Sequence, residues 1–291
     1  MKPAAFDYVC VDSVAEAVSA LAQAGDDAKI IAGGQSLVPM LNFRLLQPSV
    51  LVDINRIDAL SFLEERGNSI QVGALTRHRH LQTDPLIARR LPVLHAAMGH
   101  VAHLAIRNRG SIGGSLSHAD PAAELPMLAM LLDAELTVAG PSSTRTVRAD
   151  EFFQGALTTD LAEDELVTEI ELPLPPVQAG WDFQEVARRA GDFALVALAV
   201  TLTVSGGVVA EARIALMGIG ETPMRATDAE ALLRGQAIDA AATGAAAEAV
   251  RGAISPASDL HASADYRRHL AGVLARRALS NAWARAEGGE A

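Results

Sequence analysis

Apolar residues recur at helical spacing in the first part of the chain and also form short runs. Residues 13–24 carry an apolar side chain every three or four positions, and Ser13 with Glu16 three residues later forms a capping-box sequence, so a helix is predicted there. The same criteria predict helices over 36–46, 75–83, 92–103 and 120–132. Short apolar runs predict strands over 28–32, 50–53, 69–73, 135–139, 144–147 and 166–172.

The pattern changes after residues 172–180, where three closely spaced prolines stop both helices and strands. Two long apolar runs follow, over 193–204 and 208–217, and the Ser205–Gly207 sequence between them is typical of a hairpin turn. Helices are predicted over 226–234, 239–253 and 264–285. This part of the chain is therefore expected to form a small antiparallel sheet with helices.

The composition is that of a folded protein with more than one core. The chain has 291 residues, half of them hydrophobic, and a length near 300 residues favours two domains. With the boundary placed in the proline-rich segment, the predicted domains are residues 1–176 and 177–291. The predicted overall fold class is α+β.

Charge and rare residues exclude several functions. The formal net charge is −11 and no basic stripe is visible, which argues against nucleic-acid binding. The single cysteine, Cys10, cannot hold an iron–sulfur cluster, and with only Lys2 and Lys29 the chain has no Walker A sequence. No signal peptide or membrane-spanning stretch is predicted, so we expect a cytoplasmic protein.

Two glycine-rich segments carry the strongest chemical signal. The first glycine segment is Ala32–Leu37 (Ala-Gly-Gly-Gln-Ser-Leu), and the second is Gly110–Ser115 (Gly-Ser-Ile-Gly-Gly-Ser). Glycine lets the backbone approach a ligand closely, and successive free N–H groups bind anions, so two such segments could grip a diphosphate. Each segment taken alone is also typical of an ordinary turn, and neither matches the Rossmann G-x-G-x-x-G pattern.

Taken in order, the motifs resemble those of the FAD-binding medium subunit of the molybdenum hydroxylases, a family that includes carbon monoxide dehydrogenase and relatives of xanthine dehydrogenase. The resemblance covers essentially the whole chain. It rests on Gly33–Leu37, Gly73–Thr76, Ile106–Ser115, Ala119–Pro126, Arg188–Ala194, Asp265–Arg268 and Arg276–Leu279. It implies a two-lobed FAD-binding domain of the PCMH type, as in vanillyl-alcohol-oxidase-like flavoproteins, followed by a small C-terminal domain.

The resemblance also implies which residues bind the cofactor. The two glycine segments would cradle the FAD pyrophosphate, Thr76 would lie near the cofactor, and Glu124 would hydrogen-bond the ribityl chain or the adenosine sugar. Phe193 would pack on the isoalloxazine ring or gate access to it. The implied cofactor-binding residues are Ala32, Gly33, Gly34, Gln35, Ser36, Leu37, Thr76, Ser111, Ile112, Gly113, Gly114, Ser115, Glu124 and Phe193.

Other chemistry-bearing residues have plainer interpretations. The six histidines between His78 and His118 complete no familiar metal motif, so no metal site is predicted. Asp120 is interpreted as a helix cap, and Arg107 and Arg109 either balance phosphate charge, face a partner or are solvated. No side chain is predicted to act as an acid–base catalyst.

As the resemblance implies, the substrate would be oxidised at a molybdenum cofactor on a large subunit. Electrons would pass through iron–sulfur clusters of a small subunit to FAD on this chain, and then to NAD or another acceptor. The complex would be a dimer of heterotrimers. Two alternatives stay open: a self-sufficient FAD-dependent oxidase or reductase, and an assembly subunit that has lost its cofactor, against which the intact glycines argue.

Overall fold

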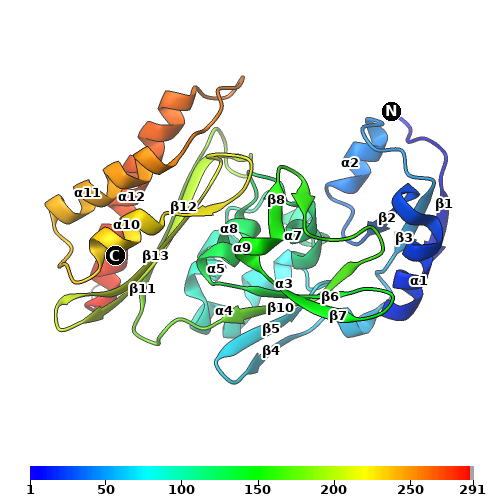
Figure 1. Ribbon diagram of the computed structural model, residues 1–291, viewed down its shortest axis with the longest axis horizontal. Helices are drawn as coiled ribbons and strands as arrows, with labels where there is room; N and C mark the ends of the chain where they lie inside the picture. Colours follow the sequence, from blue (N-terminus) through cyan, green and yellow to red (C-terminus); the bar gives the residue numbers. More distant parts are fainter. Residues whose placement is uncertain (289–291) are drawn as a thin grey trace. The chain divides into compact units, whose positions relative to one another are not determined.

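The computed structural model describes residues 1–288, which form two compact units of mixed helix and sheet (Figure 1). The N-terminal unit contains residues 1–80, 103–118 and 134–173. The C-terminal unit contains residues 81–102, 119–133 and the chain from Leu174 onward. The predicted α+β class is confirmed. The chain passes from the N-terminal to the C-terminal unit for the last time within the proline-rich segment.

The N-terminal unit begins with a small parallel sheet of strand order β1-β3-β2. Helix α1 (Val14–Ala24) buries Ala17, Val18 and Leu21 in the adjoining core. The predicted cap is confirmed, because the Ser13 hydroxyl accepts a hydrogen bond from the Glu16 N–H at 3.2 Å. The strands are β1 (Asp7–Cys10), β2 (Ala28–Ile31) and β3 (Val50–Asp53).

A second, five-stranded sheet completes the N-terminal unit, in the order β4-β5-β10-β6-β7 with antiparallel neighbours. Its strands are β4 (Leu63–Arg66), β5 (Ser69–Gly73), β6 (Glu135–Ala139), β7 (Thr144–Arg148) and β10 (Leu166–Pro173). The remaining elements are α2 (Leu37–Asn42), α6 (Leu104–Arg107), α7 (Ile112–His118), α9 (Ala149–Phe152), β8 (Phe153–Gly155) and β9 (Thr158–Thr159). Helix α3 (His78–Thr83) begins in this unit.

The C-terminal unit is built on a four-stranded antiparallel sheet in chain order. Its strands are β11 (Gly180–Ala187), β12 (Ala194–Ser205), β13 (Val208–Met217) and β14 (Met224–Arg225). The hairpin predicted around Gly206 and Gly207 is confirmed, and both glycines have left-handed φ values, +61° and +77°. This conformation suits glycine because it has no Cβ.

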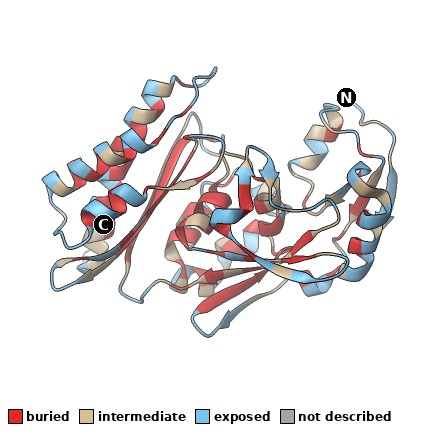
Figure 2. Ribbon diagram, in the orientation of Figure 1, coloured by how far each residue is buried: buried red, intermediate tan, exposed pale blue. Residues whose placement is uncertain are grey.

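Both faces of this sheet are covered by helices, as Figures 1 and 2 show. Helices α10 and α12 pack on one face, where α11 packs against both of them, and α5 and α8 pack on the other face. Strand β12 is therefore buried on both sides, which explains its long uninterrupted apolar sequence. The helices are α4 (Pro85–Arg90), α5 (Pro92–Ala97), α8 (Glu124–Leu131), α10 (Thr227–Leu233), α11 (Ala240–Ala253) and α12 (Ala264–Ala286).

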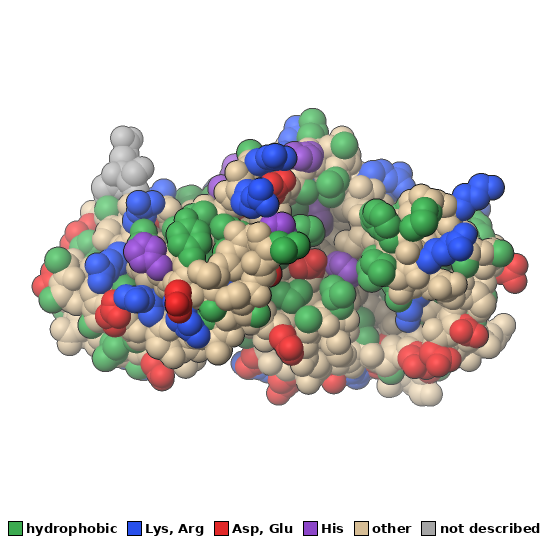
Figure 3. Space-filling view, turned by 90° about the horizontal axis from the view of Figure 1, so that it is seen from above, with side chains coloured by type: hydrophobic (Ala, Val, Ile, Leu, Met, Phe, Trp, Pro, Cys, Tyr) green, Lys and Arg blue, Asp and Glu red, His purple; other side chains and the backbone are tan. Residues whose placement is uncertain are grey.

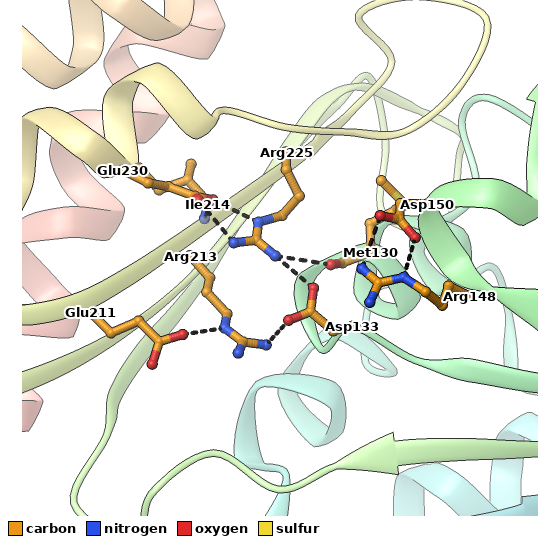
Figure 4. Close-up of polar contacts among 9 residues, drawn as sticks. All are labelled: Met130, Asp133, Arg148, Asp150, Glu211, Arg213, Ile214, Arg225 and Glu230. Atoms are coloured by element: carbon orange, nitrogen blue, oxygen red, sulfur yellow. Dashed lines mark hydrogen bonds and ion pairs between the residues drawn. The ribbon is translucent and has the colours of Figure 1, made fainter.

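A network of charged side chains ties the C-terminal end of α8 to this sheet (Figure 4). Asp133 accepts from Arg213 at 2.5 Å and from Arg225 at 2.9 Å, and Arg225 also pairs with Glu230 at 2.6 Å. At the other end of the segment, the Gly218 N–H donates to the Pro121 carbonyl at 3.0 Å. Residues 119–133 are thereby fixed to the C-terminal sheet at both ends.

Four predicted helices have different limits in the structure. The helix predicted from Asp120 begins at Glu124, because the Asp120 carboxylate accepts from the Ala122 N–H at 2.8 Å and closes a turn instead of capping the helix. The helix predicted over 36–46 covers only Leu37–Asn42, and the one predicted over 75–83 begins at His78. The helix predicted over 92–103 ends at Ala97. From Ile112 onward, the second glycine segment is the first turn of helix α7.

Candidate functional site

The first glycine segment connects β2 to α2 and lies against the second. A Cβ atom on Gly33 would lie 2.4 Å from the Arg109 carbonyl oxygen and 2.8 Å from the Gly110 Cα. No side chain fits there without moving backbone, so glycine is required for this close approach. The next residue, Gly34, has a left-handed φ of +71°. The two glycine segments, about 75 residues apart in the sequence, therefore touch backbone to backbone.

The first glycine segment presents a row of unpaired amides. Within residues 1–288, none of the N–H groups of residues 33–37 donates to a protein acceptor. The Gln35 side-chain amide donates to the Gly33 carbonyl at 2.9 Å, so this carbonyl has a partner within the segment. Successive N–H groups without partners form a site for an anion, because they supply partial positive charge without any cationic side chain.

The second glycine segment is held by residues 74–78. The Arg109 carbonyl accepts a hydrogen bond from the Arg77 side chain at 2.6 Å. The Gly110 carbonyl accepts from the His78 N–H at 2.9 Å, and the Ser111 carbonyl accepts from the His78 imidazole at 3.0 Å. In return, the N–H groups of residues 112 and 113 donate to the carbonyls of residues 76 and 74. Most of the polar backbone atoms of this segment are thus already satisfied.

Gly113 and Ser111 have distinct parts in this arrangement. A Cβ on Gly113 would lie 2.6 Å from the Ala74 Cβ, so this glycine lets α7 pack directly against the end of β5. The Ser111 N–H has no acceptor in the described part of the chain, while its hydroxyl accepts from the Gly114 N–H at 3.3 Å. Because C=O and N–H point in opposite directions across a peptide plane, the bond to the Gly110 carbonyl aims the Ser111 N–H away from His78.

His78 braces the second glycine segment and was not singled out for this role from the sequence. Burial lowers the pKa of its imidazole to about 4, so the ring is neutral near pH 7. Its Nε2 lies 3.0 Å from the Ser111 carbonyl, which can only accept, and so Nε2 carries the proton. Its Nδ1 is buried without a hydrogen-bond partner. The position of a histidine directly after the Thr76-Arg77 pair gives no sequence signal for this contact.

Thr76 is fully buried, and its side chain is already engaged. The hydroxyl donates to the Phe62 carbonyl at 2.8 Å, and its own carbonyl receives the Ile112 N–H at 3.0 Å. In this structure Thr76 therefore supports the second glycine segment through its backbone. Arg107 and Arg109 flank that segment, with Arg109 exposed.

Glu124 lies in the C-terminal unit as the first residue of α8, in a buried acidic cluster. Burial raises the pKa of its carboxyl to about 7, and the nearby Glu185 and Asp120 charges act in the same direction. Glu185 lies 3.7 Å from the His100 imidazole, and its second carboxylate oxygen is buried without a hydrogen-bond partner. The neighbouring Glu185 carboxylate raises the pKa of His100. The cluster can therefore both hold a proton and accept hydrogen bonds.

Phe193 also belongs to the C-terminal unit and lies in the turn between β11 and β12. Its side chain is 71% exposed, an unusual condition for a large aromatic residue. Gly191 in the same turn has a φ of +83°, and the Asp192 N–H donates to the Arg189 carbonyl at 3.1 Å. The turn thus presents the ring to solvent, where it is free to stack on a planar ligand.

The structure thus distributes the sequence-predicted residues between the two units. The glycine segments and Thr76 are brought together in the N-terminal unit, and Glu124 and Phe193 belong to the C-terminal unit. On the face shown in Figure 3, basic side chains lie in small groups interspersed with acidic ones. Among the described residues, no group of three or more His, Cys, Asp or Glu side chains could hold a metal ion, and no helix is long and apolar enough to cross a membrane.

Two family models together match nearly the whole chain. Residues 4–175 match the FAD binding domain in molybdopterin dehydrogenase, and residues 181–282 match the CO dehydrogenase flavoprotein C-terminal domain. The proline-rich segment lies where one match gives way to the other.

Relatives of known activity are similar over their full lengths. The 6-hydroxypseudooxynicotine dehydrogenase complex subunit alpha of Paenarthrobacter nicotinovorans is 42% identical over 98% of this chain and 97% of the relative. The carbon monoxide dehydrogenase medium chain of Hydrogenophaga pseudoflava is 40% identical over 98% and 99%. The crystal structure of quinoline 2-oxidoreductase from Pseudomonas putida 86 contains a chain that is 40% identical, with a TM-score of 0.94 and complete coverage of both chains.

Proposed function

This chain belongs to the family of FAD-binding medium subunits of the molybdenum hydroxylases, and from that premise we propose that it passes electrons from a partner's iron–sulfur clusters to NAD or another acceptor. It is an FAD-binding oxidoreductase subunit. In the proposed complex, a large subunit with a molybdenum cofactor oxidises the substrate and a small subunit carries the clusters. We propose a cytoplasmic dimer of heterotrimers, with domains at residues 1–176 and 177–291 in this chain.

The residues present fit the cofactor, because the row of unpaired amides in the first glycine segment suits a diphosphate. We propose that the N–H groups of residues 33–37 and of Ser111 bind the FAD diphosphate, with Ser36 and Ser115 adding hydroxyl donors. Ile112, Gly113 and Gly114 would set the backbone path beside it. FAD, when bound, supplies redox chemistry that accepts electrons one at a time from the clusters and can deliver a pair of electrons to the acceptor.

The C-terminal unit supplies two side chains of different kinds in this proposal. Glu124 would accept a hydrogen bond from a hydroxyl of the ribityl chain or adenosine sugar. Either oxygen of the ionised carboxylate can accept this bond, and so can the carbonyl oxygen of the protonated carboxyl. Phe193 would cover the isoalloxazine ring, which its exposure permits. Thr76 would act indirectly, because its carbonyl accepts the Ile112 N–H and thereby holds the second glycine segment in place.

The close contact at Gly33 carries this proposal and gives its test. Gly33→Ala places a methyl group 2.4 Å from the Arg109 carbonyl oxygen and forces the two segments apart. We expect at least a tenfold loss of FAD affinity, or about 1.4 kcal/mol, measured by flavin content and titration of the purified full-length chain. Gly244→Ala, at a helical glycine with open space around it, is the matched control and should retain FAD. Wild-type flavin content in Gly33→Ala would show that the first segment does not bind the diphosphate.

A second measurement separates the proposed electron-transfer role from the self-sufficient oxidase or reductase. In the proposed role, the flavin of the isolated chain is not reduced by the substrate of the complex, whereas the flavin of the assembled complex is. Reduction by substrate in the isolated chain would favour the self-sufficient enzyme. Reoxidation of the reduced complex by NAD, compared with other acceptors, tests the acceptor. The relatives' names already span a nicotine derivative, carbon monoxide and quinoline, so the substrate is sought on the large subunit.

A further inference from the structure

Two side chains bridge the two glycine segments at the point where they meet. The Arg77 guanidinium donates to the Arg109 carbonyl at 2.6 Å and to the Asn55 side-chain oxygen at 2.7 Å. Asn55 in turn donates to the Ala32 carbonyl at 2.8 Å. The Arg77–Asn55 bridge therefore begins at a carbonyl flanking the second segment and ends at the first carbonyl of the first segment.

The orientation of the Asn55 amide is set by Asp53, at the end of β3. The Asn55 Nδ2 donates to the Asp53 carboxylate at 2.6 Å, and the Asn55 backbone N–H donates to the same oxygen at 2.8 Å. The other Asp53 oxygen accepts from the Tyr8 hydroxyl. Because a carboxylate only accepts, Nδ2 must face Asp53 and Ala32, which leaves Oδ1 facing Arg77. The bridge is thus anchored in the parallel sheet.

Fixing the Ala32 carbonyl also fixes the first amide of the anion site. The Ala32 C=O and the Gly33 N–H share one peptide plane and point in opposite directions. When Asn55 holds the carbonyl, the Gly33 N–H points away from the bridge, and within residues 1–288 it has no protein acceptor. The bridge thereby orients an amide that the proposed diphosphate would use.

Arg77 also brings a positive charge close to the glycine segments. Its two hydrogen-bond acceptors are neutral, and in the described chain it forms no ion pair with a carboxylate. Burial, and next the positive charge of Arg109, lower the pKa of Arg77, while Asp53 acts in the opposite direction. Two guanidinium groups that repel each other beside a row of amides favour an anionic ligand.

We propose that Arg77 and Asn55 are positioning residues for the cofactor diphosphate: the bridge they form sets the separation of the two glycine segments and the direction of the Gly33 amide. This inference rests on the proposed function of the site. Arg77 adds positive charge beside the diphosphate, and Asn55 contributes position alone, because it is neutral.

The test uses the full-length chain freed of flavin and titrated with FAD and with riboflavin, which lacks the diphosphate. Arg77→Ala should weaken FAD binding about thirtyfold and Asn55→Ala about tenfold, as expected for loss of one charged and one neutral bridging group. Arg77→Lys retains the charge without the forked contact and should fall between wild type and Arg77→Ala. Arg66→Ala, which removes an exposed arginine paired with Glu64 in the same unit, is the control and should bind FAD as wild type does.

Two readouts separate positioning from a general effect on folding. Riboflavin affinity should be unchanged in the Arg77 and Asn55 variants, and the ³¹P resonances of bound FAD should shift in these variants but not in Arg66→Ala. The proposal is overturned if Arg77→Lys and Asn55→Ala bind FAD with wild-type affinity and unchanged ³¹P resonances, or if riboflavin binding weakens as much as FAD binding. Failure of the wild-type chain to bind FAD would instead overturn the proposed function.

Discussion

The first glycine segment leaves the amides of residues 33–37 without protein acceptors, whereas the second has most of its backbone polar atoms paired with residues 74–78. Both segments depend on glycine for close approach, but the neighbours differ. Gly33 faces the backbone of the second segment, whereas Gly113 faces the side chain and backbone of Ala74 at the end of β5. The first segment is therefore shaped for a ligand, and the second is shaped chiefly by packing within the protein. We therefore expect the first segment to contribute more directly to ligand binding than the second.

The largest effect on the free energy of unfolding is expected from His78, which braces the second segment. This effect tests whether contacts within the protein hold that segment in place. Burial lowers the pKa of His78 from 6.5 to about 4, so protonation favours the unfolded chain. Its contribution to stability is complete above pH 6.5 and is lost as the pH falls toward 4, by about 3 kcal/mol. Urea unfolding of wild type and His78→Gln across this range should show a steeper acid loss in wild type.

The difference between the pH profiles of wild type and His78→Gln isolates the contribution of His78 to stability, because groups such as Glu124 titrate in both proteins. Glu124 has a raised pKa, so its contribution has the opposite sign and is lost as the pH rises toward 7. Parallel acid profiles for wild type and His78→Gln would show that the imidazole is not the buried neutral group described above.

A smaller effect is expected from Gly113→Ala. The added methyl group would lie 2.6 Å from the Ala74 Cβ, and overpacking at this helix–strand contact should lower the free energy of unfolding of the flavin-free chain by about 2 kcal/mol. Loss of FAD should follow from this loss of stability. Calorimetry of the flavin-free chain, with Gly244→Ala as control, makes the measurement. A stable Gly113→Ala chain with strongly reduced FAD affinity would place the second segment in direct contact with the ligand and erase the contrast.

The smallest effect is expected from Ser111→Ala. Its hydroxyl accepts only the long 3.3 Å hydrogen bond from the Gly114 N–H, so the change should cost no more than about 0.5 kcal/mol of stability. The Ser111 N–H is retained, and FAD affinity should fall only slightly. A loss of FAD as large as that in Gly33→Ala, measured by the same titration, would assign the hydroxyl a main role in binding.

Local signals in the sequence predict much of the fold. Helix α1 has a capping residue and a clear apolar face, and the hairpin at Gly206 has two glycines that accept left-handed φ values, so both were predicted with nearly the observed limits. Strand β11 was missed, because it directly follows the prolines and mixes polar with apolar residues. The start of α8 was misplaced, because Asp120 closes a turn that uses the same residue type as a cap.

The site was predicted less completely, for a physical reason. The glycine segments and the family resemblance are visible in the sequence, but the pairing of backbone atoms is not. Whether the amide of Gly113 is free depends on the Ala74 carbonyl. The Arg77–Asn55 bridge depends on four chain segments that meet only after folding. Such contacts are long-range, and no spacing rule encodes them.

The assignment of residues 81–102 and 119–133 to the C-terminal unit has a consequence for synthesis of the protein. Helices α5 and α8 leave the ribosome well before strands β11, β12 and β13, against which they pack. Their apolar faces remain uncovered until the last third of the chain has emerged, and non-local pairing of this kind slows folding and exposes partly folded chains to aggregation. The nascent polypeptide therefore cannot complete the core of the C-terminal unit in the order in which it is translated.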